Sequence, residues 1–219
     1  MKLNYFCHFI NSTLSNERCV EVALAKEFIK KFPVFTEVGA VLPYYGNRGK
    51  KVIDCFDELG DDDRRFSECD IRGENIVSIS TLEHFGNAEY NNEKINNLEG
   101  LAGLLQIITQ SENYFITIPL GFNSILDKQV ESILSELNCY GFRRDVNTPW
   151  EWEMVYPITE SHFREDNLYN KEGFTKNNNY FYGANFILII TSEKIEENIS
   201  FIPYERTGLD TKNEPVTYY

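Results

Sequence analysis

The sequence has few of the residues that build metal and redox sites. Its three histidines lie far apart, and its five cysteines include no CxxC pair, so no zinc-binding pattern is present. An odd number of scattered cysteines, in a chain whose first residues do not resemble a signal peptide, indicates reduced thiols. We therefore expect a cytoplasmic protein that holds no metal.

Long apolar runs and an excess of basic residues are also missing. No apolar stretch reaches the roughly 18 residues that cross a bilayer. The chain has 34 acidic and 21 basic residues, which gives a formal net charge of −13. Nucleic-acid binding depends on neutralisation of phosphates by Lys and Arg. We therefore expect neither a membrane nor a nucleic acid as partner, and we interpret the acidity as a source of solubility.

The patterns that are present predict an α/β protein with one large domain. Helical spacing of apolar residues marks 16–32, 93–110 and the segment DKQVESILSELNCYGF (127–142). The strand signals are TEVGA (36–40), KKVIDCF (50–56), FSECDI (66–71), NIVSIS (75–80), YFITIPL (114–120), FRRDV (142–146), WEWEMVYPI (150–158) and NFILIIT (185–191). This alternation predicts a parallel sheet with helices on both faces, and an antiparallel pair at one edge. We assign residues 1–192 to the domain and 193–219 to a C-terminal extension.

The glycine fingerprint of dinucleotide-binding proteins is absent. The stretch TEVGAVLPYYG (36–46) joins a strand to a turn, but it has no GxGxxG spacing. A pyrophosphate needs that close approach to the backbone, so an NAD-dependent reductase or epimerase is disfavoured. A nucleoside cofactor without phosphates does not need it.

Several polar residues are expected where the first strands end. Glu37, Asp54 and Asp70 lie at the ends of the first three predicted strands, and residues 80–86 follow the fourth. Ligands of open α/β sheets bind outside the carboxyl ends of the strands. We therefore expect these residues at one common edge.

Four segments carry a resemblance to a known family. They are NERCVEVALAKEFIKKF (16–32), TEVGAVLPYY (36–45), NIVSISTLEHFG (75–86) and ITIPLGFNSILD (116–127). Together they resemble a family of bacterial and archaeal proteins related to class I S-adenosylmethionine-dependent methyltransferases. The resemblance covers about residues 5 to 192, and STLEHFG and TIPLGFN are its most specific parts.

The resemblance implies a fold and a cofactor. The fold would be a Rossmann-like class I methyltransferase three-layer sandwich, with a mostly parallel sheet and an antiparallel last strand. The cofactor would be S-adenosylmethionine. Glu37 and Gly39 match the cofactor-binding turn, Asp54 the acid for the ribose hydroxyls, and Asp70 the acid that meets the adenine amine. Ser80 lies at the rim where cofactor and substrate meet.

Each of these residues also has a plainer interpretation. His84 is our candidate for a catalytic base, but it could instead fasten its loop together with Glu83. Asp70 could simply stabilise a turn, and Asp57 could replace Asp54 as the acid that binds the ribose hydroxyls.

The sequence as a whole favours an S-adenosylmethionine-dependent methyltransferase acting on a small molecule or a sugar. The resemblance also gives Glu17 and Arg18 a role in shaping the site, where they would otherwise be a solvated helix start. Ala40 and Pro43 depart from the family pattern. The alternative is a non-catalytic binding or regulatory protein of the same fold, which the poor glycine turn favours.

Overall fold

The computed structural model describes residues 1–6, 8, 16–54, 56–62, 64–86, 96–144, 151–165, 168–170, 183–195 and 199–202. Its α-helices are α1 (Arg18–Lys31), α2 (Glu99–Gln110) and α3 (Ser124–Ser132). The main sheet contains β2 (Thr36–Val38), β3 (Lys51–Ile53), β4 (Asn75–Ile79), β5 (Asn113–Pro119), β6 (Cys139–Arg144), β7 (Trp152–Val155) and β10 (Phe186–Thr191). Two short pairs lie outside it: β1 (Lys2–Asn4) with β11 (Ser200–Ile202), and β8 (Tyr169–Asn170) with β9 (Gly183–Ala184).

The main sheet is mixed, in the order β3-β2-β4-β5-β10-β6-β7. Its first three strand pairs are parallel, and the pairs β5–β10, β10–β6 and β6–β7 are antiparallel. The adjacency of the strands in TEVGA and NIVSIS and the antiparallel entry of NFILIIT are confirmed. The expected Rossmann-like class I methyltransferase sandwich on a mostly parallel sheet is wrong, because half of the strand pairs are antiparallel and the described residues hold only three α-helices.

Two local features explain the difference. The strand β10 returns between β5 and β6, and β7 pairs antiparallel with β6. The described residues of the acid-rich segment 54–74, which has no apolar periodicity, form turns, a bridge of Asp62 to Ile53 and one short 3-10 turn, Phe66–Glu68, so the strand predicted in FSECDI is wrong. The helix predicted over DKQVESILSELNCYGF is also too long, because it ends at Ser132 and β6 begins at Cys139.

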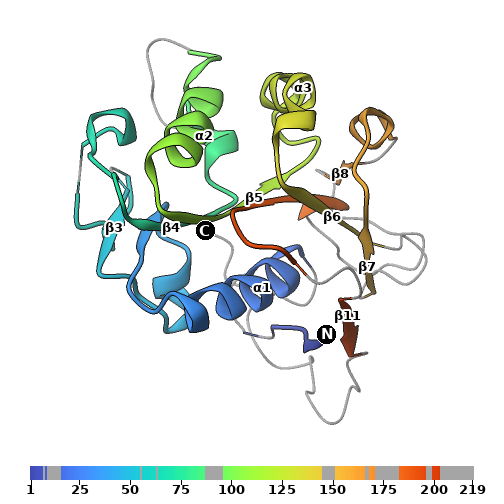
Figure 1. The fold of residues 1–219 in the computed structure, drawn as a ribbon, viewed down its shortest axis with the longest axis horizontal. Helices are drawn as coiled ribbons and strands as arrows, with labels where there is room; N and C mark the ends of the chain where they lie inside the picture. The colour runs from blue at the N-terminus through green and yellow to red at the C-terminus, as the bar shows by residue number, and fades with distance from the viewer. Residues whose placement is uncertain are drawn as a thin grey trace.

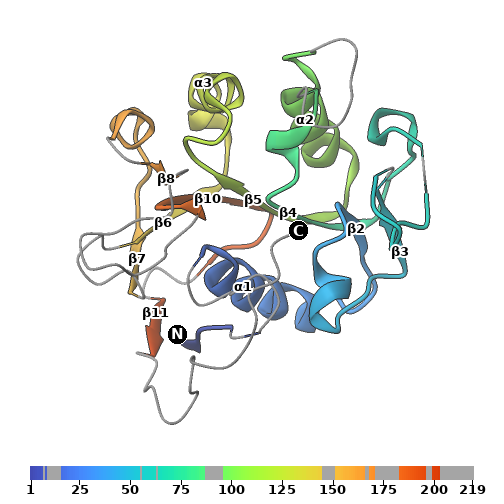
Figure 2. The same cartoon turned by 180° about the vertical axis from the view of Figure 1, so that it is seen from behind.

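Helices cover both faces of the sheet: α1 lies on one face, and α2 and α3 lie on the other (Figures 1 and 2). Side chains of β4 point alternately to the two faces of the sheet. Val77 and Ile79 pack in the hydrophobic cluster that contains α1, and Ile76 packs in the cluster that contains α2. Helix α1 is buried along its whole first half, from Cys19 to Ala25. A charged residue in that half must therefore find its partners inside the protein.

Part of the predicted extension packs on the domain. Strand β11 pairs in parallel with β1, and Phe201 stacks on Tyr5 with ring centroids 4.5 Å apart. The boundary at residue 192 stays a prediction. Within the described ranges, no helix is both long and apolar enough to span a bilayer.

Candidate functional site

The site is built where the parallel strands end. Strands β2, β4 and β5 run in the same direction, so their carboxyl ends meet at one edge of the sheet. Hydrogen bonds from the ends of β4 and β5 reach the first turn of α1, so that turn lies at the same edge. We call the charged residues gathered there, Glu17, Arg18, Glu21, Glu37 and Glu83, the carboxyl-end cluster.

Glu21 connects the elements of this cluster. Its Oε1 accepts hydrogen bonds from Ser80 Oγ at 2.5 Å and from Thr117 Oγ1 at 2.6 Å. Its Oε2 accepts from the Arg18 guanidinium at 2.8 Å, and the Glu21 side chain is fully buried. Ser80 has φ 41°, a strained value for a residue with a side chain, and these bonds hold it there. The hydroxyl of Ser80, expected to meet the cofactor, is thus bonded to a glutamate of the protein.

Glu37 shapes the turn after β2. Its Oε1 accepts from the backbone amides of Val41 at 3.0 Å and Leu42 at 2.7 Å. Its Oε2 is buried and has no hydrogen-bond partner among the residues that the structure describes. Burial raises the pKa of this carboxyl to about 8, although the two amide bonds and Arg18 oppose the rise.

Glu83 is the second buried carboxyl with an unpartnered oxygen. It lies in the 3-10 turn Leu82–His84 that follows β4, and only 1% of its surface is exposed. Its Oε1 lies 3.7 Å from His84 Nε2, while its Oε2 has no hydrogen-bond partner within the described part of the chain. Burial, with a further contribution from the charge of Glu21, raises the pKa of Glu83 well above its usual range.

The last two members of the cluster, Glu17 and Arg18, interact with each other and with the charged groups around them. Burial alone would lower the pKa of Arg18, but the carboxylates of Glu21 and Glu17 outweigh it and raise that pKa. Glu17 Oε2 accepts from the amide of Ala184 at 3.0 Å, and burial together with Glu21 raises the pKa of Glu17. Arg144 donates to the carbonyl of Ala184 at 2.8 Å and interacts electrostatically with Glu17. The cluster thus holds four carboxyl groups and one guanidinium group, with the guanidinium of Arg144 beside Glu17.

Gly39 and Asp54 lie beside the cluster but serve the protein's own packing. Gly39 has φ 85°, and a Cβ there would lie 2.0 Å from Thr81 Oγ1, so the space in front of it is filled. Asp54 accepts from the amide of Ala40 at 2.9 Å, and from the amides of Phe56 at 2.9 Å and Asp57 at 3.1 Å. Asp54 therefore joins the turns after β2 and β3.

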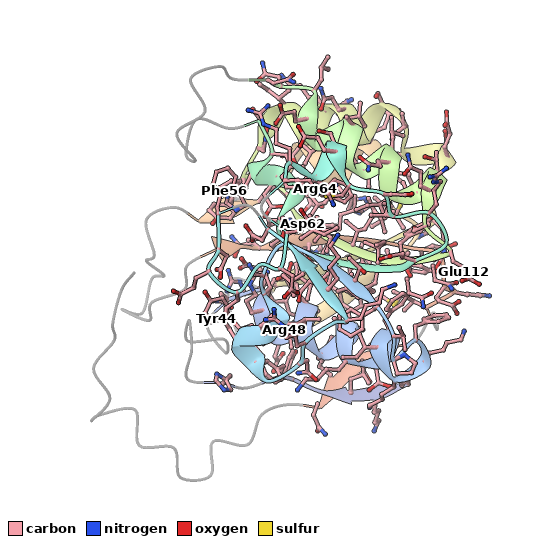
Figure 3. The ribbon with its side chains drawn as sticks, turned by 90° about the vertical axis from the view of Figure 1, so that its left-hand side faces the viewer. Tyr44, Arg48, Phe56, Asp62, Arg64 and Glu112 are labelled. Carbon is pink, nitrogen blue, oxygen red and sulfur yellow. The ribbon has the colours of Figure 1, made fainter. Side chains whose placement is uncertain are left out.

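Two exposed aromatic residues flank that junction. Tyr44 donates its hydroxyl hydrogen bond to Asp57 Oδ2 at 2.7 Å. Figure 3 shows Tyr44 and Phe56 on the same side of the molecule, and their exposed fractions are 40% and 59%. Asp57, the alternative ribose acid, is thus bonded to a tyrosine of the protein.

Asp70 does not join the other predicted site residues. The turns of segment 54–74 leave it before β4, at the amino end of that strand, and its side chain is 63% exposed. It pairs with Arg72 at 2.6 Å, which holds the pKa of Asp70 well below its usual range. A shallow hollow of about 550 Å³ lies there, lined by residues of 67–72 and of α2. The placement does not support the predicted contact of Asp70 with the adenine amine.

His84 lies at the edge expected for it. Its ring centroid is 4.6 Å from that of Phe122, and its side chain is 26% exposed. Asn123 Nδ2 donates to the carbonyl of Glu83 at 2.8 Å, while Asn123 Oδ1 caps the start of α3. The two segments that carry the family resemblance most specifically, STLEHFG and TIPLGFN, are therefore in direct contact.

Reasoning from the sequence did not find the central residue of this site. Glu21 stands in the run CVEVALA, where it is the one charged residue among apolar neighbours. A lone acid on a buried helical face was the available signal. The described residues contain no group of three or more His, Cys, Asp or Glu side chains that could hold a metal ion.

No protein-family model, no curated protein and no solved structure matches the chain. The family resemblance carried by the four segments stays a prediction.

Proposed function

We propose that the carboxyl-end cluster binds S-adenosylmethionine and that the protein transfers its methyl group to a small molecule or a sugar in the cytoplasm. One observation supports this most: Glu37 and Glu83 each keep a buried carboxyl oxygen without a described hydrogen-bond partner, in a cluster with more acids than bases. Such a site favours a cation and repels phosphates. S-adenosylmethionine is a phosphate-free nucleoside with a permanent positive charge on sulfur.

The residues present suit such a ligand in three respects. The carboxyls of Glu37 and Glu83 would stabilise its cationic part, since both lie in the cluster. Asp54 keeps acceptor capacity beyond its three backbone bonds, because a carboxylate offers about four lone-pair sites. Three described cysteines are free thiols, which is consistent with a cytoplasmic location.

S-adenosylmethionine, held beside Glu37 and Glu83, would supply an electrophilic methyl group for transfer from its sulfonium sulfur to an acceptor oxygen, and the thioether would be the leaving group. The acceptor hydroxyl would lose its proton, and we assign its removal to His84, whose ring lies at the same edge and is partly exposed. General-base help of this kind contributes about 10²- to 10⁴-fold to a rate.

A non-catalytic binding protein is the second candidate, and two observations favour it. The Thr81 side chain fills the space in front of Gly39, and Asp54 is engaged by three backbone amides. Both arrangements reduce the room for a cofactor at the end of β2.

Thermal unfolding with added nucleosides tests the proposal. Ligand at about 100 times its Kd stabilises a folded protein by about 2.7 kcal/mol, which is several degrees in Tm for a chain of this size. We expect such a rise with S-adenosylmethionine and none with NAD. A folded protein whose Tm does not move at millimolar S-adenosylmethionine would refute the proposed function.

A second assay separates the two candidates. Purified protein is incubated with S-adenosylmethionine and a panel of hydroxylated small molecules and sugars, and formation of S-adenosylhomocysteine is measured. Formation that depends on one acceptor supports the methyltransferase. Binding of the nucleoside without turnover on any acceptor supports the binding protein.

A further inference from the structure

The carboxyl-end cluster contains more carboxyl oxygens than the described hydrogen bonds and ion pairs satisfy. Glu21 has all its bonds made within the protein, to Arg18, Ser80 and Thr117. Glu37 and Glu83 do not, since each leaves one buried oxygen without a partner in the described chain. A buried carboxyl in this state must be neutralised, either by a proton or by a cation from outside.

We propose that Glu37 and Glu83 make this site selective for ligand charge, so that it retains the sulfonium form of the nucleoside and releases the neutral thioether left after methyl transfer. The inference rests on the proposed function and adds the two residues that determine its specificity. It also gives a reason for product release, because the ligand loses its positive charge when the methyl group leaves.

The charged groups that face a ligand come from every element at this edge. Helix α1 and its N-cap contribute Glu17, Arg18 and Glu21, and the end of β6 contributes Arg144 beside Glu17. The end of β2 contributes Glu37, and the turn after β4 contributes Glu83 and His84. Asp54 adds to the negative potential at Glu37, and Tyr45 interacts with Arg18. The Arg18 side chain is 18% exposed and that of His84 is 26% exposed, so a ligand reaches these two first.

The two forms of the nucleoside differ by one methyl group and one charge. The methyl group alone changes affinity, through one apolar contact, by only about fourfold. The charge should matter more, because a cation is attracted by each carboxylate of a partly buried site, and this gain must exceed the cost of removing the proton that the carboxyl otherwise holds. With two such carboxyls, we expect the cationic form to bind at least about tenfold tighter than the neutral form.

Binding of a cation should also displace protons from the site. Burial raises the pKa of Glu37 to about 8, so this carboxyl holds a proton near neutral pH, and burial also raises the pKa of Glu83 well above its usual range. A cationic ligand and a proton then compete for the same groups. Affinity for the cationic nucleoside should therefore rise between pH 6 and pH 8, whereas affinity for the thioether should change little.

Isothermal titration calorimetry tests the inference with three ligands. They are S-adenosylmethionine, S-adenosylhomocysteine, and an analogue with a protonated amine in place of the sulfonium. The variants are wild type, Glu83→Gln, and Asp127→Asn as a matched control. Asp127 of α3 is a third buried carboxyl with one oxygen that has no hydrogen-bond partner among the described residues; its other oxygen accepts from the Gly121 amide, and it does not belong to the cluster.

In wild type and in Asp127→Asn, we expect both cationic ligands to bind at least about tenfold tighter than S-adenosylhomocysteine. In Glu83→Gln, affinity for the thioether should persist while that preference falls several-fold. Glutamine matches the protonated carboxyl in shape, so the variant should fold, which its Tm without ligand checks. Equal affinities in wild type, or an unchanged preference in Glu83→Gln, would overturn the inference and leave the proposed function standing. Failure of all three ligands to bind would instead remove the proposed function.

Discussion

The two edges of the main sheet hold similar ion pairs in opposite environments. At the amino end of β4, Asp70 and Arg72 pair at 2.6 Å on the open surface. At the carboxyl end, Arg18 and Glu21 pair at 2.8 Å, with Glu21 fully buried and bonded to two further hydroxyl groups. Water screens the first pair, and the protein interior strengthens the second and every charge around it. Burial, rather than pair geometry, therefore distinguishes the ion pairs at the two edges.

Removing the buried carboxylate should have the largest effect. Glu21→Ala leaves Arg18, Ser80 and Thr117 without their acceptor, and we expect a loss of about 3–5 kcal/mol in the free energy of unfolding. Glu27→Ala on the same helix is the control, because Glu27 forms an exposed pair with Lys30 and no other ion pair among the described residues. Urea denaturation of the two variants measures the difference. Similar losses in both would show that burial does not distinguish these pairs.

A smaller loss is expected at the turn after β2. Gly39→Ala places a Cβ against Thr81 Oγ1 at φ 85°, and we expect a loss of about 2–3 kcal/mol in stability. Gly73→Ala, at the amino end of β4, has a similar φ of 70° but open space around its Cβ position. The control should cost about 1 kcal/mol, from backbone strain alone. Equal costs in denaturant melts would mean that Thr81 does not fill the space at Gly39.

The pH dependence of stability should also differ between the edges. The folded protein holds the proton of Glu37 more tightly than the unfolded chain does, because burial raises the folded pKa to about 8. The contribution of Glu37 to the free energy of unfolding is therefore fully present below the pKa of the unfolded chain. It decreases as the pH rises toward 8, by about 1.4 kcal/mol per pH unit. Glu37→Gln should flatten the curve between pH 5 and pH 8 by that slope. An unchanged slope in chemical denaturation would show that Glu37 is ionised in the folded protein.

The smallest effect is expected from Asp70→Asn. Asp70 is exposed and its pair with Arg72 is screened by water, so Tm at pH 7 should not change measurably. Its pKa is lowered in the folded protein, so its contribution to stability is present above the unfolded pKa and disappears only in acid. A clear fall in Tm at pH 7 would assign Asp70 a structural role that its exposure does not indicate.

The sequence predicted the elements whose signals are local. NIVSIS, YFITIPL and NFILIIT are continuous β-prone runs, and each forms a strand of the main sheet. The mixed architecture was not predictable in the same way, and the predicted mostly parallel sheet was wrong, because strand direction in the second half of the sheet depends on where β10 inserts.

The site was predictable only in part. Glu37 and Ser80 follow from their places at strand ends, and the structure brings both to the carboxyl-end cluster. Glu21 reaches Thr117 across 96 positions of the chain, and no local pattern shows that contact. Asp70 was assigned to the site because CDI resembles the end of a strand. In the structure, Asp70 instead lies in a turn of an acidic segment that precedes β4.

Hydrogen exchange of backbone amides with and without S-adenosylmethionine tests the comparison of the two edges most directly. We predict slower exchange on ligand addition in residues 37–42 and 79–84, around Glu37 and Glu83 at the carboxyl ends of β2 and β4. Residues 67–72 and 102–110, which line the hollow at the amino end, should exchange at unchanged rates. Protection at the hollow instead, or no protection in either region with ligand at about 1 mM, would contradict the assignment of the functional site to the carboxyl-end cluster.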